Sequence, residues 1–248
     1  MDSELLITFG DTSAGISLDG ACLTRFSVGD EDLLFPDGML EVEGRLKRRG
    51  GMPLLFPNAG PLLDGSPFPL PQHGFARDLP WELLRRSEDA ATISLKRDAD
   101  ERYPFSLRLE VSICVAPGRL DYGFSVVNES PSPLPMAPGL HPYFAVPYEF
   151  RSELITNAPG FDPSTYDWSE VLVLDRVDPL ELTLPGGTRL TAVSSSDLTT
   201  TVIWSEPGRD FLCIEPWAAA PGALTNPDAC LHALPGETKS FHYSLAVS

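Results

Sequence analysis

The residues best suited to proton transfer in this sequence are a histidine and a glutamate, each placed beside proline. His141 lies between Pro138 and Pro142, whose rings restrict the backbone and so hold the imidazole in one orientation. Glu215 follows an apolar run and precedes Pro216-Trp217, which predicts a partly desolvated carboxylate at a strand end. Imidazole titrates near neutral pH, so the two groups suit general acid–base chemistry. The alternatives are a buried histidine bonded to backbone and a solvated glutamate on an edge strand.

Further polar side chains that could bind a ligand lie before and within a segment rich in glycine and proline. His73 follows Gln72 and precedes Gly74, which allows either a tight turn or the close approach of a ligand. Arg49 ends a basic cluster that is otherwise typical of a solvated face. Arg77-Asp78 is expected to form an ordering ion pair. Arginine and glutamine bind hydroxyl groups, so Arg49, Gln72 and His73 are candidate binding residues for a polyhydroxylated substrate.

Several motifs that would indicate other chemistry are absent from the sequence. There is no G-x-G-x-x-G after a strand, no Walker loop and no G-x-S-x-G elbow, which argues against nucleotide-dependent and serine-hydrolase enzymes. There is also no C-x-x-C pair and no H-E-x-x-H motif. The cysteines, Cys22, Cys114, Cys213 and Cys230, are widely spaced, so we expect buried free thiols, no metal site and no cofactor.

A period-two alternation of apolar residues, typical of strands, dominates the pattern along the chain. Every second position is apolar from Phe105 to Val115 and again from Leu120 to Val126, which predicts an antiparallel hairpin with a turn at Pro117-Gly118. Further short apolar runs occur at residues 5–9, 21–28, 91–95, 171–174, 180–184, 188–193, 200–204, 211–214 and 241–247. No segment has the apolar period of a helix. We therefore predict an all-β chain, a large antiparallel β-sandwich or barrel.

Two long segments, residues 50–81 and 131–147, are too rich in glycine and proline to follow this alternation. Loops of this length in a compact domain are usually functional, and these two contain His73 and His141. No change of composition marks a linker and no internal repeat is present. We therefore expect residues 1–248 to form a single domain.

The charge balance limits the partners of this chain. Its 248 residues include 35 acidic and 18 basic side chains, a formal net charge of −17, which disfavours nucleic acids and anionic membranes. No apolar run approaches the ~18 residues of a transmembrane helix. The start, Met1-Asp2-Ser3-Glu4, is acidic where a secretory signal is basic. We expect a cytoplasmic protein, a monomer or homodimer, that acts on a small molecule.

These motifs resemble those of the aldose 1-epimerase (galactose mutarotase) family, and most closely its branch of aldose-epimerase-like and hexose-phosphate mutarotase proteins. The matching blocks follow the family order and span most of the chain, at residues 49–61, 72–81, 139–144, 213–217 and 234–238. The H-G-F-A-R-D sequence at residues 73–78 is the most specific of them, whereas L-P-G-E alone would be weak.

The resemblance implies the galactose mutarotase-like supersandwich and a cofactor-independent isomerase that interconverts the α and β anomers of an aldose. It implies that Glu215 is the general base for the anomeric hydroxyl and that His141 is the general acid for the ring oxygen. His73 and Arg49 would position hydroxyl groups or polarise the ring oxygen. Asp175 is similar to a family aspartate that binds sugar hydroxyls, although an ordinary aspartate at a strand end has the same appearance.

Three functions remain open on the sequence alone. The first is an aldose 1-epimerase that acts on a neutral sugar, and it is the one that we favour. The second is a mutarotase of a hexose 6-phosphate, which the basic residues 45–49 allow, although the net charge gives an anionic ligand no general help. The third is a carbohydrate-binding protein on the same fold that lacks turnover.

Overall fold

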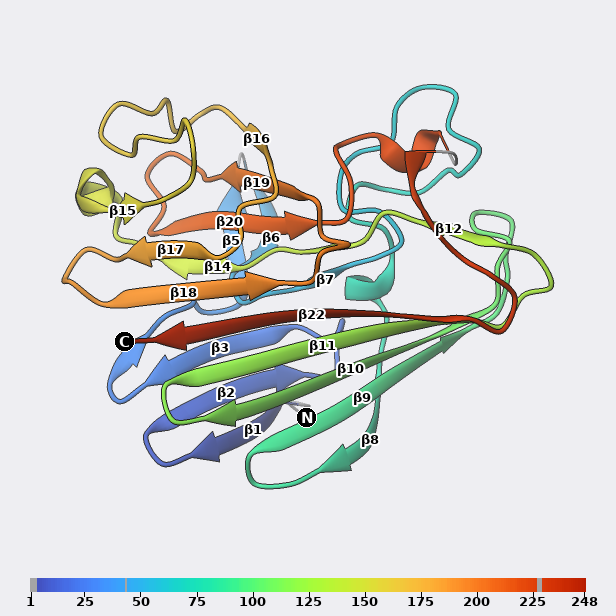
Figure 1. The fold of residues 1–248 in the computed structure, drawn as a ribbon, viewed down its shortest axis with the longest axis horizontal. Helices are drawn as coiled ribbons and strands as arrows, with labels where there is room; N and C mark the ends of the chain where they lie inside the picture. The colour runs from blue at the N-terminus through green and yellow to red at the C-terminus, as the bar shows by residue number, and fades with distance from the viewer. Residues whose placement is uncertain (1–3, 43, 227–228) are drawn as a thin grey trace.

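Antiparallel strands make up nearly all of the regular structure in the computed structural model, which describes residues 4–42, 44–226 and 229–248 (Figure 1). Short 3₁₀ helices interrupt the strands at η1 (Ala76–Asp78), η2 (Tyr148–Glu153) and η3 (Ala223–Thr225). The all-β prediction is therefore confirmed. In the part of the chain described, no helix has the length and apolar composition needed to cross a bilayer. Residues 1–3 of the acidic start lie outside the described residues.

The largest sheet of the described residues has eight antiparallel strands and contains the predicted hairpin (Figure 1). In order across the sheet, the strands are β15 (Ile155–Thr156), β17 (Leu180–Thr183), β18 (Arg189–Ser194), β22 (Thr238–Val247), β11 (Arg119–Asn128), β10 (Leu107–Ala116), β9 (Ala90–Arg97) and β8 (Glu82–Arg86). Leu109 on β10 pairs with Val126 on β11, and Phe124 pairs with Phe241 on β22. The period-two pattern thus predicted both the strands and the face that is buried.

A second sheet carries the residues singled out for chemistry. Its strands are β16 (Leu172–Asp175), β19 (Thr200–Trp204), β20 (Phe211–Trp217), β13 (Gly139–Leu140) and β7 (Leu54–Leu55), and β14 (Tyr143–Ala145) also pairs with β20. Smaller sheets are formed by β1 (Glu4–Phe9), β2 (Thr12–Ser17), β3 (Leu23–Val28) and β4 (Glu31–Asp32), by β5 (Gly38–Val42) with β6 (Arg45–Arg49), and by β12 (Leu134–Met136) with β21 (Leu231–Ala233).

Strand β20 separates the hydrophobic core from the candidate site. Its even-numbered residues Leu212 and Ile214 belong to the main core cluster, which also takes in side chains of the eight-stranded and four-stranded sheets, such as Leu245 and Phe26. The odd-numbered Glu215 and its odd-numbered neighbours therefore point to the opposite face of the sheet. All of β20 is buried, so both of its faces are covered. The apolar run in the sequence reflects this double burial.

The two segments expected to be loops are only partly irregular. Residues 50–81 contain β7 and η1, and residues 131–147 contain β12, β13 and β14. The prediction missed these strands because their prolines lack a backbone N–H and break the ladder into pieces too short to show alternation. The cysteine prediction was also wrong in part, since Cys114 is exposed and Cys230 is half-buried, whereas Cys22 and Cys213 are buried free thiols.

A fully buried arginine holds the turn between β19 and β20. The Nη2 of Arg151, on η2, lies 2.6 Å from the hydroxyl oxygen of Ser205 and 2.8 Å from the carbonyl oxygen of Phe211, and it also donates to the Arg209 carbonyl. The guanidinium packs against Tyr148 and Trp168, with its central carbon 4.6 and 4.7 Å from the ring centres. The cation therefore pairs with carbonyl and hydroxyl oxygens and two aromatic rings instead of water.

We expect Arg151→Met to lower the free energy of unfolding by about 2–4 kcal/mol, because it leaves several buried oxygen acceptors without a donor. Chemical denaturation monitored by tryptophan fluorescence measures this change. The matched control is Arg45→Met at the exposed start of β6, which should change stability by less than about 0.5 kcal/mol. Equal effects of the two substitutions would contradict the assigned role of Arg151.

Candidate active site

A cavity of about 360 Å³ opens on the face of β20 that carries the odd-numbered residues. This volume lies within the range of about 300–1,000 Å³ typical of small-molecule sites. Polar and aromatic side chains and two valines, from six separate segments, line it: Arg49, Gln72, His73, Arg77, His141, Tyr143, Val171, Val202, Trp204, Glu215 and Trp217. Five of the six residues predicted for the site are among them.

The pairing of β20 with the broken strand β13–β14 brings His141 opposite Glu215. Gly139 pairs with Trp217 and Tyr143 pairs with Cys213, so the same register places residue 141 across from residue 215. Each of the two is followed by proline, which has no N–H to donate, and the backbone pairing of the two strands is interrupted between these residues. Directly opposed side chains on neighbouring strands lie close together. The Nε2 of His141 is accordingly 3.4 Å from Oε1 of Glu215.

Burial dominates the protonation of this pair. The side chains of His141 and Glu215 are 5% and 2% exposed. Burial raises the pKa of Glu215 well above its ordinary value, although the Trp217 hydrogen bond and Arg77 act against it. Burial also lowers the pKa of His141 well below its ordinary value, and the electrostatic interactions with His73, Arg77 and Arg49 lower it further. The uncharged arrangement, with the proton on Glu215, is therefore favoured in the free protein.

A tryptophan holds the glutamate in place. The indole Nε1 of Trp217 donates a hydrogen bond of 3.0 Å to Oε2 of Glu215, which leaves Oε1 for His141. Gly139 makes room for this indole, because a Cβ atom at residue 139 would lie 2.6 Å from the Trp217 ring. Gly139, the glycine of the G-L-H-P block, thus leaves space for the indole that binds Glu215 on the neighbouring strand.

His73 is held in one orientation by a backbone contact. Its Nδ1 lies 2.6 Å from the carbonyl oxygen of Ala59, which can only accept, so Nδ1 carries the proton. Burial and Arg77 lower the pKa of His73 to about 4. At neutral pH its Nε2 is then a hydrogen-bond acceptor, able to position a hydroxyl group but not to polarise a ring oxygen. The strained backbone of His73, at φ +71°, is typical of functional sites.

The glycine at residue 74 is required by a close backbone contact within the protein and not by a ligand. Its φ is +67°, and a Cβ atom there would lie 2.1 Å from the carbonyl oxygen of Phe56. The close approach expected at this glycine is therefore that of another backbone segment, which receives the N–H of Phe75 in a 2.8 Å hydrogen bond.

Arg49 lies at the wall of the cavity and forms an ion pair within the protein. Its Nη2 and Nε lie 2.6 and 3.0 Å from Oε1 of Glu206, and its guanidinium packs 5.4 Å from the centre of the Trp204 ring. Glu206 lies in the turn that Arg151 holds, so the two arginines are coupled through that turn. The basic cluster is thus more than a solvated face, since Arg48 also pairs with Asp37 at 2.8 Å.

Arg77 has a different position from the one that the sequence analysis predicted. Among the described side chains it makes no ion pair with Asp78, and it lines the cavity instead. It also lines a neighbouring cavity of about 280 Å³, together with Lys47, Arg48 and Arg49. The available signal was its position in the sequence, four residues after the candidate His73 and within the same specific motif.

Asp175 is the one predicted residue that the structure does not bring to the site. It is exposed at the end of β16 and does not line the cavity, whereas Val171, just before the strand, does. Four residues along a strand correspond to about 13 Å. The aromatic residues Tyr143 and Trp204 line the cavity but were not predicted, because apolar alternation alone does not separate a site face from a core face.

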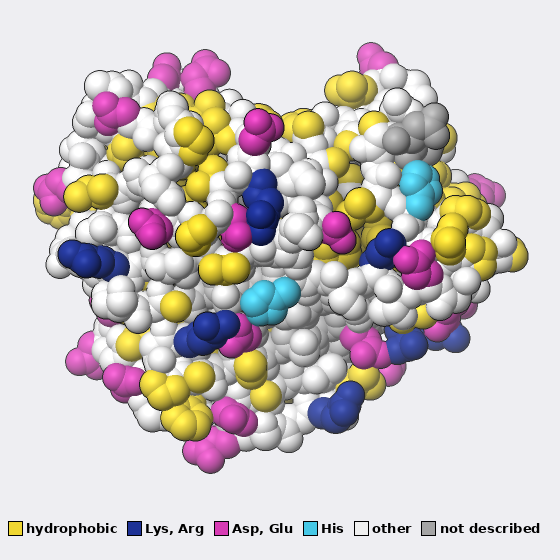
Figure 2. Space-filling view, viewed as in Figure 1, with side chains coloured by type: hydrophobic (Ala, Val, Ile, Leu, Met, Phe, Trp, Pro, Cys, Tyr) yellow, Lys and Arg dark blue, Asp and Glu magenta, His cyan; other side chains and the backbone are white. Residues whose placement is uncertain are grey.

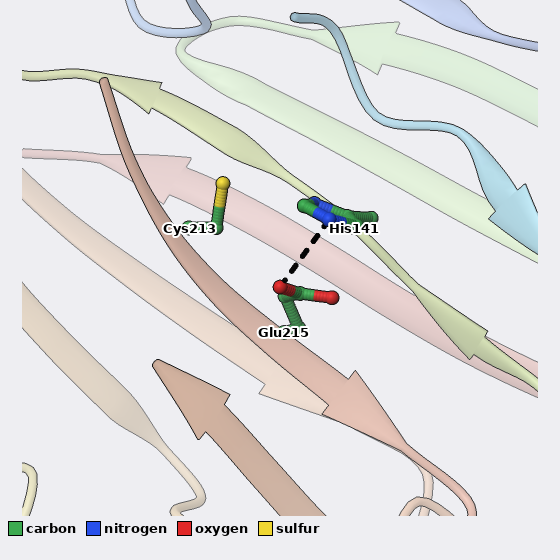
Figure 3. A group of neighbouring side chains, drawn as sticks. All are labelled: His141, Cys213 and Glu215. Atoms are coloured by element: carbon green, nitrogen blue, oxygen red, sulfur yellow. Dashed lines mark ion pairs between the residues drawn. The ribbon is translucent and has the colours of Figure 1, made fainter. Parts of the chain in front are cut away.

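One group of side chains in the described part of the chain is close enough to share a metal ion. The ligand atoms of His141, Cys213 and Glu215 all lie within 4.8 Å of one another (Figure 3). On the face shown in Figure 2, Asp and Glu side chains are spread widely, in keeping with the net charge of the chain.

Comparison with solved structures establishes the fold. A protein of Synechocystis sp. PCC 6803 superposes with a TM-score of 0.84 at 24% sequence identity, covering 100% of this chain and 96% of its own. The galactose mutarotase related enzyme of Lactobacillus acidophilus superposes with a TM-score of 0.79 at 20% identity, covering 99% of this chain and 97% of its own. The predicted galactose mutarotase-like architecture is confirmed.

Curated relatives match a shorter region. Two proteins named "Putative glucose-6-phosphate 1-epimerase", from Escherichia coli K12 and Salmonella typhimurium LT2, are 33% identical over 92 residues and 34% identical over 86 residues. These alignments cover 37% and 34% of this chain, and 30% and 28% of the relatives, so the chain matches about a third of their length. The profile of the aldose 1-epimerase family matches residues 4–158, more than half of the chain. The chain belongs to the aldose 1-epimerase family.

Proposed function

We propose that this chain interconverts the α and β anomers of a phosphorylated hexose by opening and closing the sugar ring. The observation that carries the proposal is the buried pair His141 and Glu215, 3.4 Å apart at the wall of a cavity of small-molecule size. The anomeric oxygen and the ring oxygen are bonded to the same carbon, so two adjacent groups can serve both. Ring opening needs one proton removed from the first oxygen and one delivered to the second.

The proton steps follow from the geometry of the pair. In the reactive arrangement the shared proton lies on Nε2 of His141 and Glu215 is ionised, held by the Trp217 N–H. Glu215 takes the proton of the anomeric hydroxyl while His141 gives its proton to the ring oxygen, and the carbon–oxygen bond of the ring breaks. The free aldehyde then turns about its bond to the next carbon. The reverse transfers close the other anomer.

The burial of the pair favours this cycle. After ring opening Glu215 is protonated and His141 is neutral, which is the uncharged arrangement that burial stabilises. The charged arrangement is the less stable one before reaction, so the chemical step relieves an electrostatic cost. Nε2 of His73 would accept a hydrogen bond from a sugar hydroxyl, and Trp204 and Trp217 offer apolar faces to the ring.

Arg77 supports a phosphorylated substrate over a neutral one. Arg49 is already paired with Glu206, whereas no hydrogen bond or ion pair to another described side chain holds the Arg77 guanidinium. Lys47, Arg48 and Arg49 line the neighbouring cavity with it. Asp37, which pairs with Arg48, and Asp78 line that cavity as well, so its four basic side chains face two acidic ones. A phosphate group binds arginine through charge-assisted hydrogen bonds. The names of the two curated relatives support the same substrate class.

We expect Glu215→Gln and His141→Ala each to lower kcat for the interconversion of α- and β-glucose 6-phosphate by about 10²- to 10⁴-fold, because each removes one proton-transfer group. Polarimetry of freshly dissolved anomer in a poorly catalytic buffer measures the rate. Binding of glucose 6-phosphate by calorimetry should persist in Glu215→Gln, which keeps the shape of the side chain. A wild-type protein that binds the sugar without accelerating its relaxation would be a carbohydrate-binding protein.

The pH dependence of kcat/KM should be bell-shaped, since the reaction needs the pair to hold one proton. As pH falls through the lowered pKa of His141, a second proton blocks the base, so the acid limb should lie below the ordinary histidine value of 6.5. As pH rises through the raised pKa of Glu215, the shared proton is lost, so the alkaline limb should lie above 4.5. Unphosphorylated glucose serves as the control for titration of the substrate phosphate. An acid limb at or above 6.5 would contradict this account.

We expect Arg77→Met to raise KM for glucose 6-phosphate by about 10- to 100-fold and to change KM for glucose little, because it removes a charge-assisted hydrogen bond to phosphate. Arg45→Met, an exposed arginine of the same basic cluster, is the matched control. Added salt should weaken glucose 6-phosphate binding in the wild type and have less effect in Arg77→Met. An equal loss for both sugars would favour the aldose 1-epimerase that acts on neutral sugars.

A further inference from the structure

Three different metal-binding atoms, those of His141, Cys213 and Glu215, lie within 4.8 Å of one another beside the cavity-lining face of β20 (Figure 3). Cys213 and Glu215 are two residues apart on the strand, so their side chains share this face. His141 reaches the same point from the broken strand opposite. A thiol, an imidazole and a carboxylate form a donor set that suits Zn²⁺, whereas Mg²⁺ and Ca²⁺ prefer oxygen ligands alone.

The spacing of the donors suits a tetrahedral ion. A zinc ion holds nitrogen and oxygen ligands at about 2.0–2.2 Å, so two of them lie about 3.3–3.5 Å apart at a tetrahedral angle. The observed separation between Nε2 of His141 and Oε1 of Glu215 is 3.4 Å. The sulfur of Cys213 lies within 4.8 Å of the other donors, and a Zn–S bond of about 2.3 Å requires it to move by about 1 Å.

We propose that Zn²⁺ binds across His141, Cys213 and Glu215 and inhibits the protein by occupying its acid–base pair, an inference that rests on the proposed function. His141 and Glu215 line the cavity, which gives the ion an entry path and leaves a fourth position open to water or a sugar hydroxyl. Binding releases the thiol proton of Cys213 and the shared proton of the pair to solvent. Without that shared proton, ring opening stops.

The surroundings fit a reversible inhibitor better than a resident cofactor. Trp217 supports Glu215 by its hydrogen bond, but Nδ1 of His141 is buried with no hydrogen-bond partner among the described residues. Zinc-binding histidines almost always donate this second N–H to an acceptor, and the loss of such an acceptor lowers metal affinity by about 10- to 100-fold. A chelator should therefore remove the ion and leave an active protein.

Binding is tested first without any measurement of activity. Addition of Co²⁺ to the metal-free wild-type protein should produce thiolate-to-cobalt charge-transfer absorption that Zn²⁺ abolishes. The absorption should vanish in Cys213→Ser and persist in Cys114→Ser, whose cysteine is exposed on β10. Thermal melting checks that Cys213→Ser is folded. X-ray absorption of the zinc-loaded wild type gives a second readout without a variant, a single sulfur neighbour at about 2.3 Å.

Inhibition is tested next. Zn²⁺ should abolish glucose 6-phosphate interconversion in the wild type, a chelator should restore it, and Mg²⁺ should have no effect. The Zn²⁺ concentration for half-inhibition, relative to each variant's own metal-free rate, should rise at least about 10-fold in Cys213→Ser and stay constant in Cys114→Ser. The inference is overturned by absorption that survives Cys213→Ser, by the absence of a sulfur neighbour, or by a chelated protein that requires Zn²⁺ for turnover. If the protein binds metal as described but has no mutarotase activity, the proposed function fails and the metal site stands.

Discussion

The register between β20 and the broken strand β13–β14 is the constraint on which the rest of the site depends. A shift of one residue would turn Glu215 from the cavity to the core and exchange it with Ile214. Gly139 opposite Trp217 and Tyr143 opposite Cys213 fix that register on both sides of the pair. The prolines that follow His141 and Glu215 remove backbone donors at the point where the two side chains meet. The sheet therefore holds the two side chains close together, and its ladder of backbone hydrogen bonds is interrupted at the same point.

Burial of His141 and Glu215 sets the protonation of the site. An ionised glutamate with only its Trp217 donor, and a cationic histidine near Arg49 and Arg77, are both disfavoured, so the pair rests with its proton on the carboxyl group. In the proposed reaction, ring opening returns the pair to that uncharged arrangement. A divalent cation on the same donors would be stabilised by the ionised carboxylate and thiolate, whereas Arg49 and Arg77 would weaken its binding, in keeping with an ion that a chelator removes.

The role of each arginine follows from the groups that it contacts. Arg151 is buried and fixes the turn that contains Glu206. Glu206 in turn binds Arg49, whose guanidinium packs against Trp204. Arg77 has no such partner in the described part of the chain and remains available to a ligand. The net charge of −17 makes this local concentration of cations more informative, because most of the surface would repel an anion.

The sequence by itself determined the all-β fold, because period-two alternation marks strands with one buried face, and its motifs singled out His141 and Glu215, which the structure brings together. It also indicated Arg49, Gln72 and His73, which lie in specific blocks. Only the tertiary structure decided that residues 139–140 and 143–145, on either side of His141-Pro142, form strands, that Arg77 lines the cavity and that Asp175 does not. The physical reason is that these outcomes depend on pairing between residues some 70 or more positions apart, and a one-dimensional pattern carries no information about which strands become neighbours.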